Sequence, residues 1–455
     1  MRKNLILCTD SYKLSHAWQY PEGTQFVSSY IEARKGEESV FFGLQAILKE
    51  FFTTPITAED IDEAETVCMA HIGMFNREGW ETILKDHGGY IPLEVKAVPE
   101  GTVMPTRNAQ VVIVNTDPRL PWLTSYFEPV FLQVWYPSTV ATLSRNMKKI
   151  IYEGLKVSSD DPDAQIPFKL HDFGYRGTSS FESACFGGMG HLVNFMGTDT
   201  IPALTGVKRF YEESLMAGFS IPASEHSTIT AWGKDGEIDA YRNMLKKFPT
   251  GLMACVSDSY DIFNATANYW GNVLHDEVMQ RDGTLVVRPD SGNPTTVPLD
   301  IIEILMDKFG FSVNSKGFKV LPPQVRIIQG DGITAESLPI LIMNAVERNI
   351  SIDNFAMGMG GGLLQKVDRD TFGYAMKTSA AYINGNWRDV YKDPITDQGK
   401  ASKRGIQKLV KVDGQFKTVA EIHAQGLEDQ MKLVYKDGKL FNTQTFTEIR
   451  ERAKL

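Results

Sequence analysis

The sequence lacks the features that mark secreted, zinc-binding or membrane-spanning proteins. Its four cysteines, Cys8, Cys68, Cys185 and Cys255, lie far apart without a CxxC pair, so they predict neither a zinc site nor a disulfide framework. No apolar run reaches the roughly 18 residues that a membrane span needs, and the apolar run near the N-terminus is too short for a signal peptide. We therefore expect a cytoplasmic protein with reduced, buried cysteines.

An excess of positive charge is also missing. The 455 residues carry 47 Lys and Arg against 56 Asp and Glu, a net charge of -9, which argues against nucleic acid as the main partner. Local basic clusters for a small anion remain compatible with this balance. The eight histidines show no HxH or HExxH spacing, and neither a Ser-His-Asp motif nor paired carboxylates stand out. Protein-borne metal chemistry and acid–base hydrolysis are therefore not indicated.

One pattern recurs between about residues 166 and 365. A short apolar run leads into a turn rich in Gly, Asp and Arg, and a helical pattern follows. The apolar runs are 168–170, 252–256, 284–287, 325–328 and 354–357. Such fully apolar runs are typical of parallel strands buried on both faces, and the intervening helices indicate a βαβ succession. The loops after these strands should converge on one end, where ligands bind.

The flanking parts of the chain read differently. Residues 25–125 mix strand-like and helical patterns, and residues from about 380 on read as short strands joined by turns. We therefore predict a barrel-like α/β domain of residues 126–365, with 1–28 packed on it. Residues 29–125 plus 366–455 should form a second, α+β domain.

Three of the strand-to-helix turns have the composition of phosphate-binding loops. In 288–292, Arg288 offers a guanidinium fork for phosphate oxygens, and Asp290 suits sugar hydroxyls or hydrated magnesium. Segment 330–332 places a carboxylate between two glycines, and 358–362 is rich enough in glycine for close approach to phosphate. Each alone is also compatible with an ion pair, an Asx turn or a packing turn. Their succession predicts a site for a phosphorylated sugar.

Four further residues in such loops are candidates. Phe173 can stack on a flat heteroaromatic ligand or belong to the core, and Arg176 adds a cation in the same turn. Asp199 can accept a hydrogen bond from an amide NH2 or cap a helix. His226, beside a carboxylate, can act as a base or nucleophile or be structural.

Taken in order, the motifs resemble those of the nicotinamide phosphoribosyltransferase family. They are DSYK at 10–13, HDFGYRG at 171–177, GTDT at 197–200, EHSTITAW at 225–232, SDSYD at 257–261, RPDSG at 288–292, QGDG at 329–332 and GGGLLQK at 360–366. The resemblance runs from about residue 4 to the C-terminus. It implies a type II phosphoribosyltransferase, an irregular α/β barrel with a second α+β domain. It also implies condensation of nicotinamide with 5-phosphoribosyl-1-pyrophosphate (PRPP) to nicotinamide mononucleotide and pyrophosphate.

The resemblance assigns roles to individual residues. Phe173 and Tyr12 of the partner subunit would stack on the two faces of the pyridine ring, Asp199 would accept the carboxamide NH2, and Arg176 would lie near the carbonyl. The ribose and its phosphate would be held by Arg288, Asp290, Gly330, Asp331, Gly360 and Gly361. The pyrophosphate would meet the basic residues Arg34, Arg369, Lys377, Lys392 and Lys400. Catalytic roles are expected for Arg288, Asp290, Asp331 and His226.

Cofactors and assembly also follow from the resemblance. Mg²⁺ would be carried mainly by the substrate phosphates, and ATP would phosphorylate His226 and so drive synthesis. The protein would be a homodimer with shared active sites and with neither nucleic acid nor membrane as a partner. Ala375 stands where a phosphate-touching serine is expected, which would affect affinity rather than reaction type.

Other functions remain open at this point. The nearest is nicotinate phosphoribosyltransferase, but the carboxylate of Asp199 would repel nicotinate and so favours nicotinamide. A barrel aldolase or isomerase acting on a sugar phosphate would want a Schiff-base lysine at a strand end, and none is found there. A nucleotide-binding protein without enzymatic activity is the third possibility.

Overall fold

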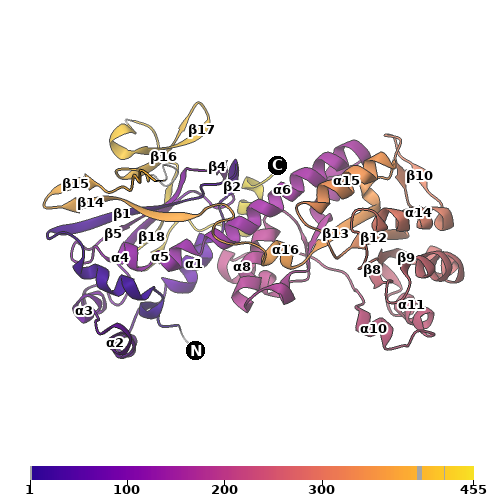
Figure 1. Ribbon diagram of the computed structural model, residues 1–455, viewed down its shortest axis with the longest axis horizontal. Helices are drawn as coiled ribbons and strands as arrows, with labels where there is room; N and C mark the ends of the chain where they lie inside the picture. Colours follow the sequence, from indigo (N-terminus) through magenta and orange to yellow (C-terminus); the bar gives the residue numbers. More distant parts are fainter. Residues whose placement is uncertain (1–2, 397–401, 425) are drawn as a thin grey trace. The chain divides into compact units, whose positions relative to one another are not determined.

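The computed structural model describes residues 3–396, 402–424 and 426–455, and the chain forms two compact units. Unit 1 contains the N-terminal segment up to Thr142, Val207–Glu213 and Asp368–Lys454; unit 2 contains Leu143–Gly206 and Ser214–Val367. Figure 1 shows both units with their elements labelled. In the part of the chain described, no helix has the length and apolar character needed to cross a membrane.

Unit 2 is organised around a sheet of six strands. Their order is β7-β6-β13-β12-β9-β8, and every pairing is parallel. The strands are β6 (Leu170–Asp172), β7 (Gly197–Thr198), β8 (Thr250–Val256), β9 (Asp282–Arg288), β12 (Val325–Gln329) and β13 (Phe355–Met359). Five of these strands, β6, β8, β9, β12 and β13, correspond to runs predicted from the sequence, whereas the short strand β7 was not predicted.

A short extended segment closes this sheet into a ring. Phe219 bridges Gly197 of β7, and Ala223 bridges Ala254 of β8, both in the parallel sense. The N–H of Thr198 donates to the carbonyl of Phe219 at 3.1 Å. The segment between Phe219 and Ala223 therefore completes an irregular α/β barrel, which confirms the predicted fold class.

Helices alternate with these strands and cover the barrel. They are α7 (Pro162–Gln165), α8 (Phe181–Leu192), α9 (Ile201–Tyr211), α10 (His226–Thr230), α11 (Glu237–Lys247), α12 (Ile262–Asn264), π-helix η5 (Ala265–Val273), α13 (His275–Met279), α14 (Val297–Phe309), α15 (Ser337–Glu347) and α16 (Gly361–Leu364). Ala254, Val286 and Ile328, from three adjacent strands, form a buried cluster against which Phe173 packs. A small hairpin of β10 (Ser312–Val313) and β11 (Lys319–Val320) extends from the unit.

Unit 1 is an α+β unit. Its sheet has the order β15-β14-β1-β5-β3-β18-β19, with antiparallel pairings. The strands are β1 (Thr24–Glu32), β3 (Leu93–Ala97), β5 (Ala109–Asn115), β14 (Ala375–Ile383), β15 (Asn386–Asp389), β18 (Lys432–Lys436) and β19 (Lys439–Leu440). The helices are η1 (Leu5–Leu7), η2 (Ser11–Trp18), α1 (Leu44–Phe51), α2 (Ala58–Ile72), α3 (Arg77–Asp86), α4 (Leu123–Tyr126), α5 (Glu128–Leu132) and α17 (Phe446–Arg452). A separate pair joins β2 (Glu38–Val40) to β4 (Val103–Pro105).

The turns predicted in the last part of the sequence are confirmed. β16 (Gln407–Val412) and β17 (Gln415–Ala420) are joined through Asp413 and Gly414, with φ of 51° and 78°. Asp437 and Gly438, with φ of 47° and 87°, join β18 to β19 in the same way. Consecutive positive φ values at Asp-Gly match the two-residue hairpin turn that this dipeptide favours.

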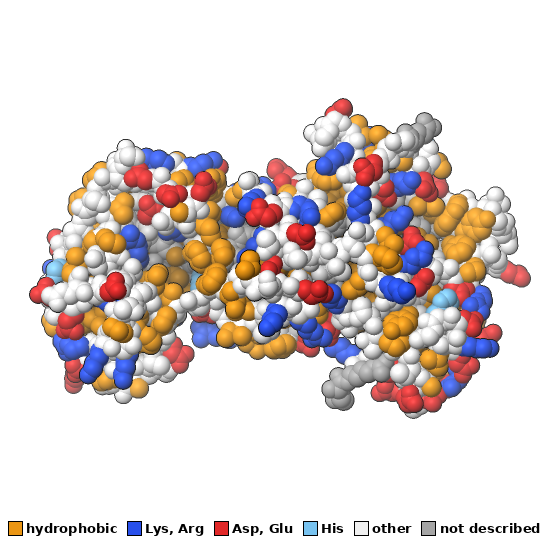
Figure 2. All heavy atoms as spheres, turned by 180° about the vertical axis from the view of Figure 1, so that it is seen from behind, with side chains coloured by type: hydrophobic (Ala, Val, Ile, Leu, Met, Phe, Trp, Pro, Cys, Tyr) orange, Lys and Arg blue, Asp and Glu red, His pale blue; other side chains and the backbone are white. Residues whose placement is uncertain are grey.

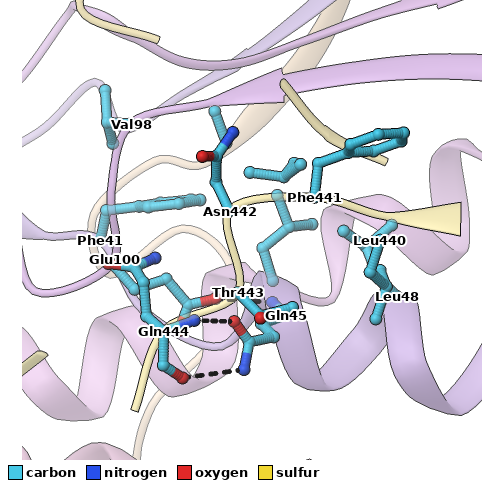
Figure 3. A pocket seen from close by; sticks show the side chains of 13 residues that line it. Phe41, Gln45, Leu48, Val98, Glu100, Leu440, Phe441, Asn442, Thr443 and Gln444 are labelled. Carbon is cyan, nitrogen blue, oxygen red and sulfur yellow. Dashed lines mark hydrogen bonds between the residues drawn. The ribbon is translucent and has the colours of Figure 1, made fainter. Parts of the chain in front are cut away.

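The C-terminal segment of unit 1 is tied to α1. Figure 3 shows Gln45 on α1 facing Gln444: the N–H of Gln444 donates to Oε1 of Gln45 at 2.8 Å, and Nε2 of Gln45 donates back to the carbonyl of Gln444 at 3.1 Å. Glu100 lies buried beside them and accepts hydrogen bonds from the N–H groups of Gly43 and Gln45. Gln45, Glu100 and Gln444 line a small cavity. None of the functional residues indicated by the sequence lines this cavity.

The division between the units differs from the predicted one. The N-terminal segment belongs to unit 1 rather than to the barrel, because η1 packs on α2, where Asn4 Nδ2 donates to the carbonyl of Asp60 at 2.8 Å. The first boundary falls after Thr142, inside the 24-residue helix α6 (Trp135–Ser158). A continuous helix shows no break in composition, so the sequence pattern does not mark this boundary.

The first barrel strand is also displaced from the predicted run. Residues up to Phe168 form the 3₁₀ helix η3 (Ile166–Phe168), and β6 begins at Leu170. Pro167, immediately before the predicted run and within η3, has no N–H to donate to a neighbouring strand. The strand therefore includes His171 and Asp172, which the sequence pattern assigned to the following turn.

Candidate active site

Because all strands of the barrel run in the same direction, the residues that end them gather at one end of the ring. The six strands and the closing segment each contribute polar, aromatic or glycine residues to this end. In chain order these are Phe173, Asp199, His226, Asp258, Arg288 with Asp290, Gly330 with Asp331, and Gly360 with Gly361. The structure therefore brings the barrel residues indicated by the sequence to one face of unit 2.

Arg288 and Asp290 form a two-pronged ion pair. Nε and one terminal nitrogen of Arg288 donate to the two carboxylate oxygens of Asp290 at 3.0 and 2.9 Å. A side chain at Gly330 would place its Cβ 2.8 Å from Oδ1 of Asp290, so the glycine is needed for this approach. The pairing that the sequence left open thus exists in the structure, and it orients the guanidinium fork at the end of β9.

Negative charges surround this guanidinium. Burial disfavours the charged form of Arg288, but the hydrogen bonds and charge of Asp290, with the charges of Asp258 and Asp199, outweigh burial and raise its pKa. The carboxylates of three successive strand ends therefore lie close enough to act on one cation. A phosphate group entering here would meet a fully ionised fork.

The ring of Phe173 lies on the backbone of β13, the neighbouring strand in the sheet. A Cβ built at Gly358 of β13 would come within 2.1 Å of Cε2 of Phe173. The N–H of Phe173 donates to the carbonyl of Met359 at 3.0 Å. The guanidinium carbon of Arg288 lies 5.8 Å from the ring centroid, and the ring of His171 lies 4.7 Å away, tilted by 41°. The phenyl ring is thus fixed at the barrel mouth.

Asp199 receives two hydrogen bonds on a single oxygen. Nε2 of His171 lies 2.9 Å from Oδ1, and the hydroxyl of Ser220, in the closing segment, donates to the same atom. Partial burial opposes ionisation, but the hydrogen bond and charge of His171, then Ser220 and Arg288, outweigh it and lower the pKa of Asp199. Within the described residues Oδ2 has no hydrogen-bond partner, and 45% of the side chain is exposed.

His226 begins the short helix α10 and is held by a carboxylate. Its Nε2 lies 2.9 Å from Oδ1 of Asp258, whose side chain is 5% exposed, whereas that of His226 is 48% exposed. The hydroxyl of Thr228 accepts a hydrogen bond from the N–H of Glu225, which starts the helix. Among the described residues Nδ1 of His226 makes no hydrogen bond. The pair leaves one imidazole nitrogen available at the barrel mouth.

The other barrel candidates lie around the same end. Gly360 precedes α16 and Gly361 is its first residue; a Cβ on Gly361 would meet nothing within 4 Å, so open space adjoins it. Asp331 is exposed, and Arg176 is exposed on the 3₁₀ helix η4 (Tyr175–Gly177).

Unit 1 carries its own cluster of basic side chains. Lys377 of β14 pairs with Tyr30 of β1. Partial burial lowers the pKa of Lys377, and the positive charges of Arg34, Lys392 and Arg369 lower it further against the opposing effect of Glu128. Four of the five basic residues expected to contact pyrophosphate are therefore neighbours within this unit.

Two of these residues have informative surroundings. Nε of Arg34 donates to Glu32 at 2.7 Å, whereas its buried terminal nitrogen Nη2 has no hydrogen-bond partner among the described residues. Tyr12, on η2, is 57% exposed. Lys400 lies outside the described residues. Ala375 is buried in β14 opposite Glu32.

Figure 2 shows that Lys and Arg side chains are interspersed with Asp and Glu across the face displayed. No group of three or more His, Cys, Asp or Glu side chains suited to a metal ion occurs in the described part of the chain. The basic cluster of unit 1 is therefore a local feature of an otherwise mixed surface.

Sequence reasoning missed three residues of the site. His171 and Asp258 lie within motifs that it singled out, so the motifs were the available signal, but their partners Asp199 and His226 are 28 and 32 residues away in sequence. Ser220 lies in the closing segment, which pairs only through isolated bridges and was not predicted as a strand. Only the ring order brings these pairs together.

Comparisons with known proteins agree with the resemblance. The pattern that defines the nicotinate phosphoribosyltransferase (NAPRTase) family matches residues 168–439. The N-terminal domain of nicotinamide phosphoribosyltransferase matches residues 4–95. The nicotinamide phosphoribosyltransferase of Xanthomonas campestris pv. campestris (strain 8004) is 48% identical over 460 residues, covering 99% of this chain and 98% of the relative. That of Mycoplasma pneumoniae is 34% identical over 442 residues, covering 89% and 95%.

Solved structures show the same fold at much lower sequence identity. The nicotinate-nucleotide pyrophosphorylase from Pyrococcus furiosus has a TM-score of 0.62 and 15% identity, covering 99% of this chain and 95% of that one. Human nicotinic acid phosphoribosyltransferase has a TM-score of 0.56 and 16% identity, covering 98% and 92%. These likenesses establish that the barrel and its second domain form a known architecture.

Proposed function

Because the chain belongs to the nicotinate phosphoribosyltransferase family, we propose that it transfers the 5-phosphoribosyl group of PRPP to nicotinamide and releases pyrophosphate. The product is nicotinamide mononucleotide, a precursor in NAD biosynthesis. The arrangement of Phe173, His171 and Asp199 carries the proposal, because it places an aromatic platform beside an ionised hydrogen-bond acceptor at the barrel mouth.

The reaction needs little acid–base chemistry. The bond between ribose C1 and the pyrophosphate oxygen breaks, its electron pair leaves with pyrophosphate, and the neutral pyridine nitrogen supplies the electron pair of the new bond to C1. Positive charge develops on the ribose as negative charge develops on the leaving group. Catalysis therefore depends on holding the base and sugar in line and on neutralising the leaving group.

The barrel residues account for the binding of the sugar phosphate. Arg288 presents an ionised fork for phosphate, and Asp290, already aligned by that fork, can accept hydrogen bonds from ribose hydroxyls. Gly361 adjoins open space where main-chain N–H groups can approach phosphate oxygens. Exposed Asp331 lies on the neighbouring strand end and can bind the second hydroxyl.

The leaving group requires cations. The basic cluster of unit 1 suits it. Lys377 is partly buried among like charges, and Nη2 of Arg34 has no hydrogen-bond partner among the residues that the structure describes, so an anion would stabilise both side chains. In the homodimer that we propose, Tyr12 of the partner subunit completes the stacking on the base, and the partner's basic cluster meets the pyrophosphate. Measurement of the molar mass in solution tests the dimer.

Magnesium fits this chemistry through hard oxygen ligands. The carboxylates of Asp258 and Asp290 lie near Arg288 and can bind the ion or its water ligands, while the diphosphate supplies the remaining oxygens. When bound, the ion neutralises charge that develops on the leaving group. The described residues contain no group of three or more His, Cys, Asp or Glu side chains that could hold a metal ion. We therefore propose that the affinity of the protein for magnesium depends on bound PRPP.

Asp199 sets the choice between nicotinamide and nicotinate. Oδ2, which has no hydrogen-bond partner in the described part of the chain, can accept from a carboxamide NH2, and the negative charge repels a second carboxylate. Turnover is tested by incubating the enzyme with PRPP, magnesium and either base, and by measuring mononucleotide and pyrophosphate. Nicotinamide should be preferred; preferential use of nicotinate would instead support the alternative function, and no turnover of either base would refute the proposal.

The Asp199→Ser variant tests the residue itself. Serine removes the charge, so the preference for nicotinamide in kcat/KM should narrow by about one to two orders of magnitude. An unchanged ratio in the folded variant would assign selectivity to other residues.

ATP is proposed to act through His226. Asp258 holds Nε2, which orients the ring and leaves Nδ1 as the nucleophile toward the γ-phosphorus of ATP. The N–P bond forms as the bond to the ADP leaving oxygen breaks. Incubation with γ-labelled ATP should give an acid-labile phosphohistidine that is absent from His226→Ala, and the variant should retain basal synthesis without ATP stimulation. Loss of basal turnover in a folded variant would assign a different role to His226.

A further inference from the structure

The side chain of His171 lies between the two groups that would contact the base. On one side its ring centroid is 4.7 Å from that of Phe173. On the other its Nε2 is 2.9 Å from Oδ1 of Asp199. Only 13% of the His171 side chain is exposed, so its position is fixed by packing.

The neighbouring strand is shaped around this imidazole. A Cβ built at Gly197 of β7 would lie 2.7 Å from Nδ1 and 3.3 Å from Cγ of His171. Any side chain at Gly197 would therefore displace the ring. The backbone of Gly197 is not in the left-handed region, so the need for glycine comes from this contact and not from the backbone conformation. The glycine leaves room for a histidine that points along the strand end toward Asp199.

The two donors to Asp199 divide its carboxylate into unequal oxygens. His171 and Ser220 both bond to Oδ1, whereas Oδ2 has no partner in the described parts of the chain. A carboxylate on a freely rotating side chain would offer either oxygen to a ligand. Here two donors, one on β6 and one in the closing segment, hold Oδ1. Only Oδ2 can therefore accept a hydrogen bond from the base.

We propose that His171 is a specificity-determining positioning residue, which fixes Asp199 so that Oδ2 receives the carboxamide NH2 of nicotinamide. The inference rests on the proposed function and deepens it. His171 acts through Asp199: it holds the orientation of the carboxylate, while Asp199 makes the contact with the base.

The ionisation of Asp199 depends on the same contact. After the opposing effect of partial burial, the hydrogen bond from His171 is the largest cause of its lowered pKa. Without this donor the carboxylate would rotate more freely and would protonate more readily. Loss of His171 should therefore weaken nicotinamide binding and lower the preference for nicotinamide over nicotinate.

A matched pair of substitutions separates positioning from bulk structure. The amide nitrogen of His171→Gln can occupy the place of Nε2, whereas the shorter amide of His171→Asn ends near the place of Nδ1 and cannot reach Oδ1. Both variants are polar and comparable in folding demands. Ser220→Ala removes the second donor to Oδ1 and leaves the imidazole intact.

The readout is the ratio of kcat/KM for nicotinamide to that for nicotinate, measured at saturating PRPP and magnesium. We expect the ratio to fall about tenfold in His171→Asn, as for loss of one hydrogen bond to a charged group. In His171→Gln it should stay within about threefold of the wild type, and Ser220→Ala should fall between the two. Most of the change for nicotinamide should appear in KM, because the contact already exists in the bound ground state.

Controls separate this inference from the proposed function. His275→Asn, on α13 where the ring stacks on Phe309, changes a histidine away from the strand ends and should leave the ratio unchanged. If the wild type uses neither base, the proposed function fails. If the wild type prefers nicotinamide and His171→Asn lowers kcat/KM for both bases equally, or changes neither, His171 does not position Asp199.

Discussion

Substitution of Gly358 by alanine tests whether the aromatic platform depends on a missing side chain. Gly358 lies in β13 with a backbone outside the left-handed region, so alanine is acceptable to the backbone itself. The new Cβ would lie 2.1 Å from Cε2 and 2.3 Å from Cδ2 of Phe173. The substitution therefore acts on the ring of Phe173 rather than on the strand.

The size of the effect follows from the overlap. Ordinary contact begins at 3.4 Å, so the phenyl ring must move by at least about 1.3 Å to accommodate the methyl group. A displacement of about 1 Å in a group that orients a substrate can cost about 100-fold in rate, equivalent to about 2.7 kcal/mol. We expect Gly358→Ala to lower kcat/KM for nicotinamide by about this factor, with a smaller change in KM for PRPP.

The assay is steady-state synthesis of the mononucleotide, with the melting temperature as the folding control. The two single variants Gly358→Ala and Phe173→Ala are compared with the double variant. If the clash with the ring is the cause, alanine at 358 should have little further effect once Phe173 is removed. Wild-type activity in folded Gly358→Ala, or an equal loss in the Phe173→Ala background, would refute the reasoning.

Three further predictions concern single residues. Lys169 is buried and donates to the carbonyls of Ile352 and Phe355 at 2.8 and 2.9 Å; burial lowers its pKa to about 7. The unfolded chain therefore binds more protons than the folded chain between pH 7 and the ordinary lysine value, so this group makes the free energy of unfolding rise with pH across that window. In urea titrations at several pH values, Lys169→Met should flatten the rise of the unfolding free energy with pH. Because it leaves carbonyls unpaired, it should also lower that free energy by about 1–3 kcal/mol at pH 7. An unchanged dependence of the unfolding free energy on pH would contradict the lowered pKa of Lys169. Arg288→Lys cannot form the two-pronged pair with Asp290, so KM for PRPP should rise about tenfold while KM for nicotinamide changes little, and equal changes in both constants would contradict a phosphate-specific role. Burial raises the pKa of the Cys255 thiol to about 12, so iodoacetamide at pH 8 should leave Cys255 unmodified in the folded enzyme by mass spectrometry, and rapid alkylation would contradict its burial.

The fold was readable in the sequence where the information is local. Runs such as 285–287 are apolar throughout because the strand is covered on both faces, and the Gly- and Asp-rich turns mark where each strand ends. Because parallel strands share a direction, the end of the barrel where the candidate residues gather followed without knowledge of the strand order. The Asp-Gly turns at 413–414 and 437–438 specify their hairpins through the two residues themselves.

The sequence by itself thus determined the barrel, the end where the candidate residues gather, and candidate residues such as Arg288 and Asp199. Only the tertiary structure decided how these residues are paired. His171 meets Asp199, and His226 meets Asp258, because the ring places their strands and loops together. The closing segment that carries Ser220 pairs through isolated bridges rather than as a regular strand. Such contacts depend on the order in which distant segments pack, and side-chain spacing along the chain carries no record of that order.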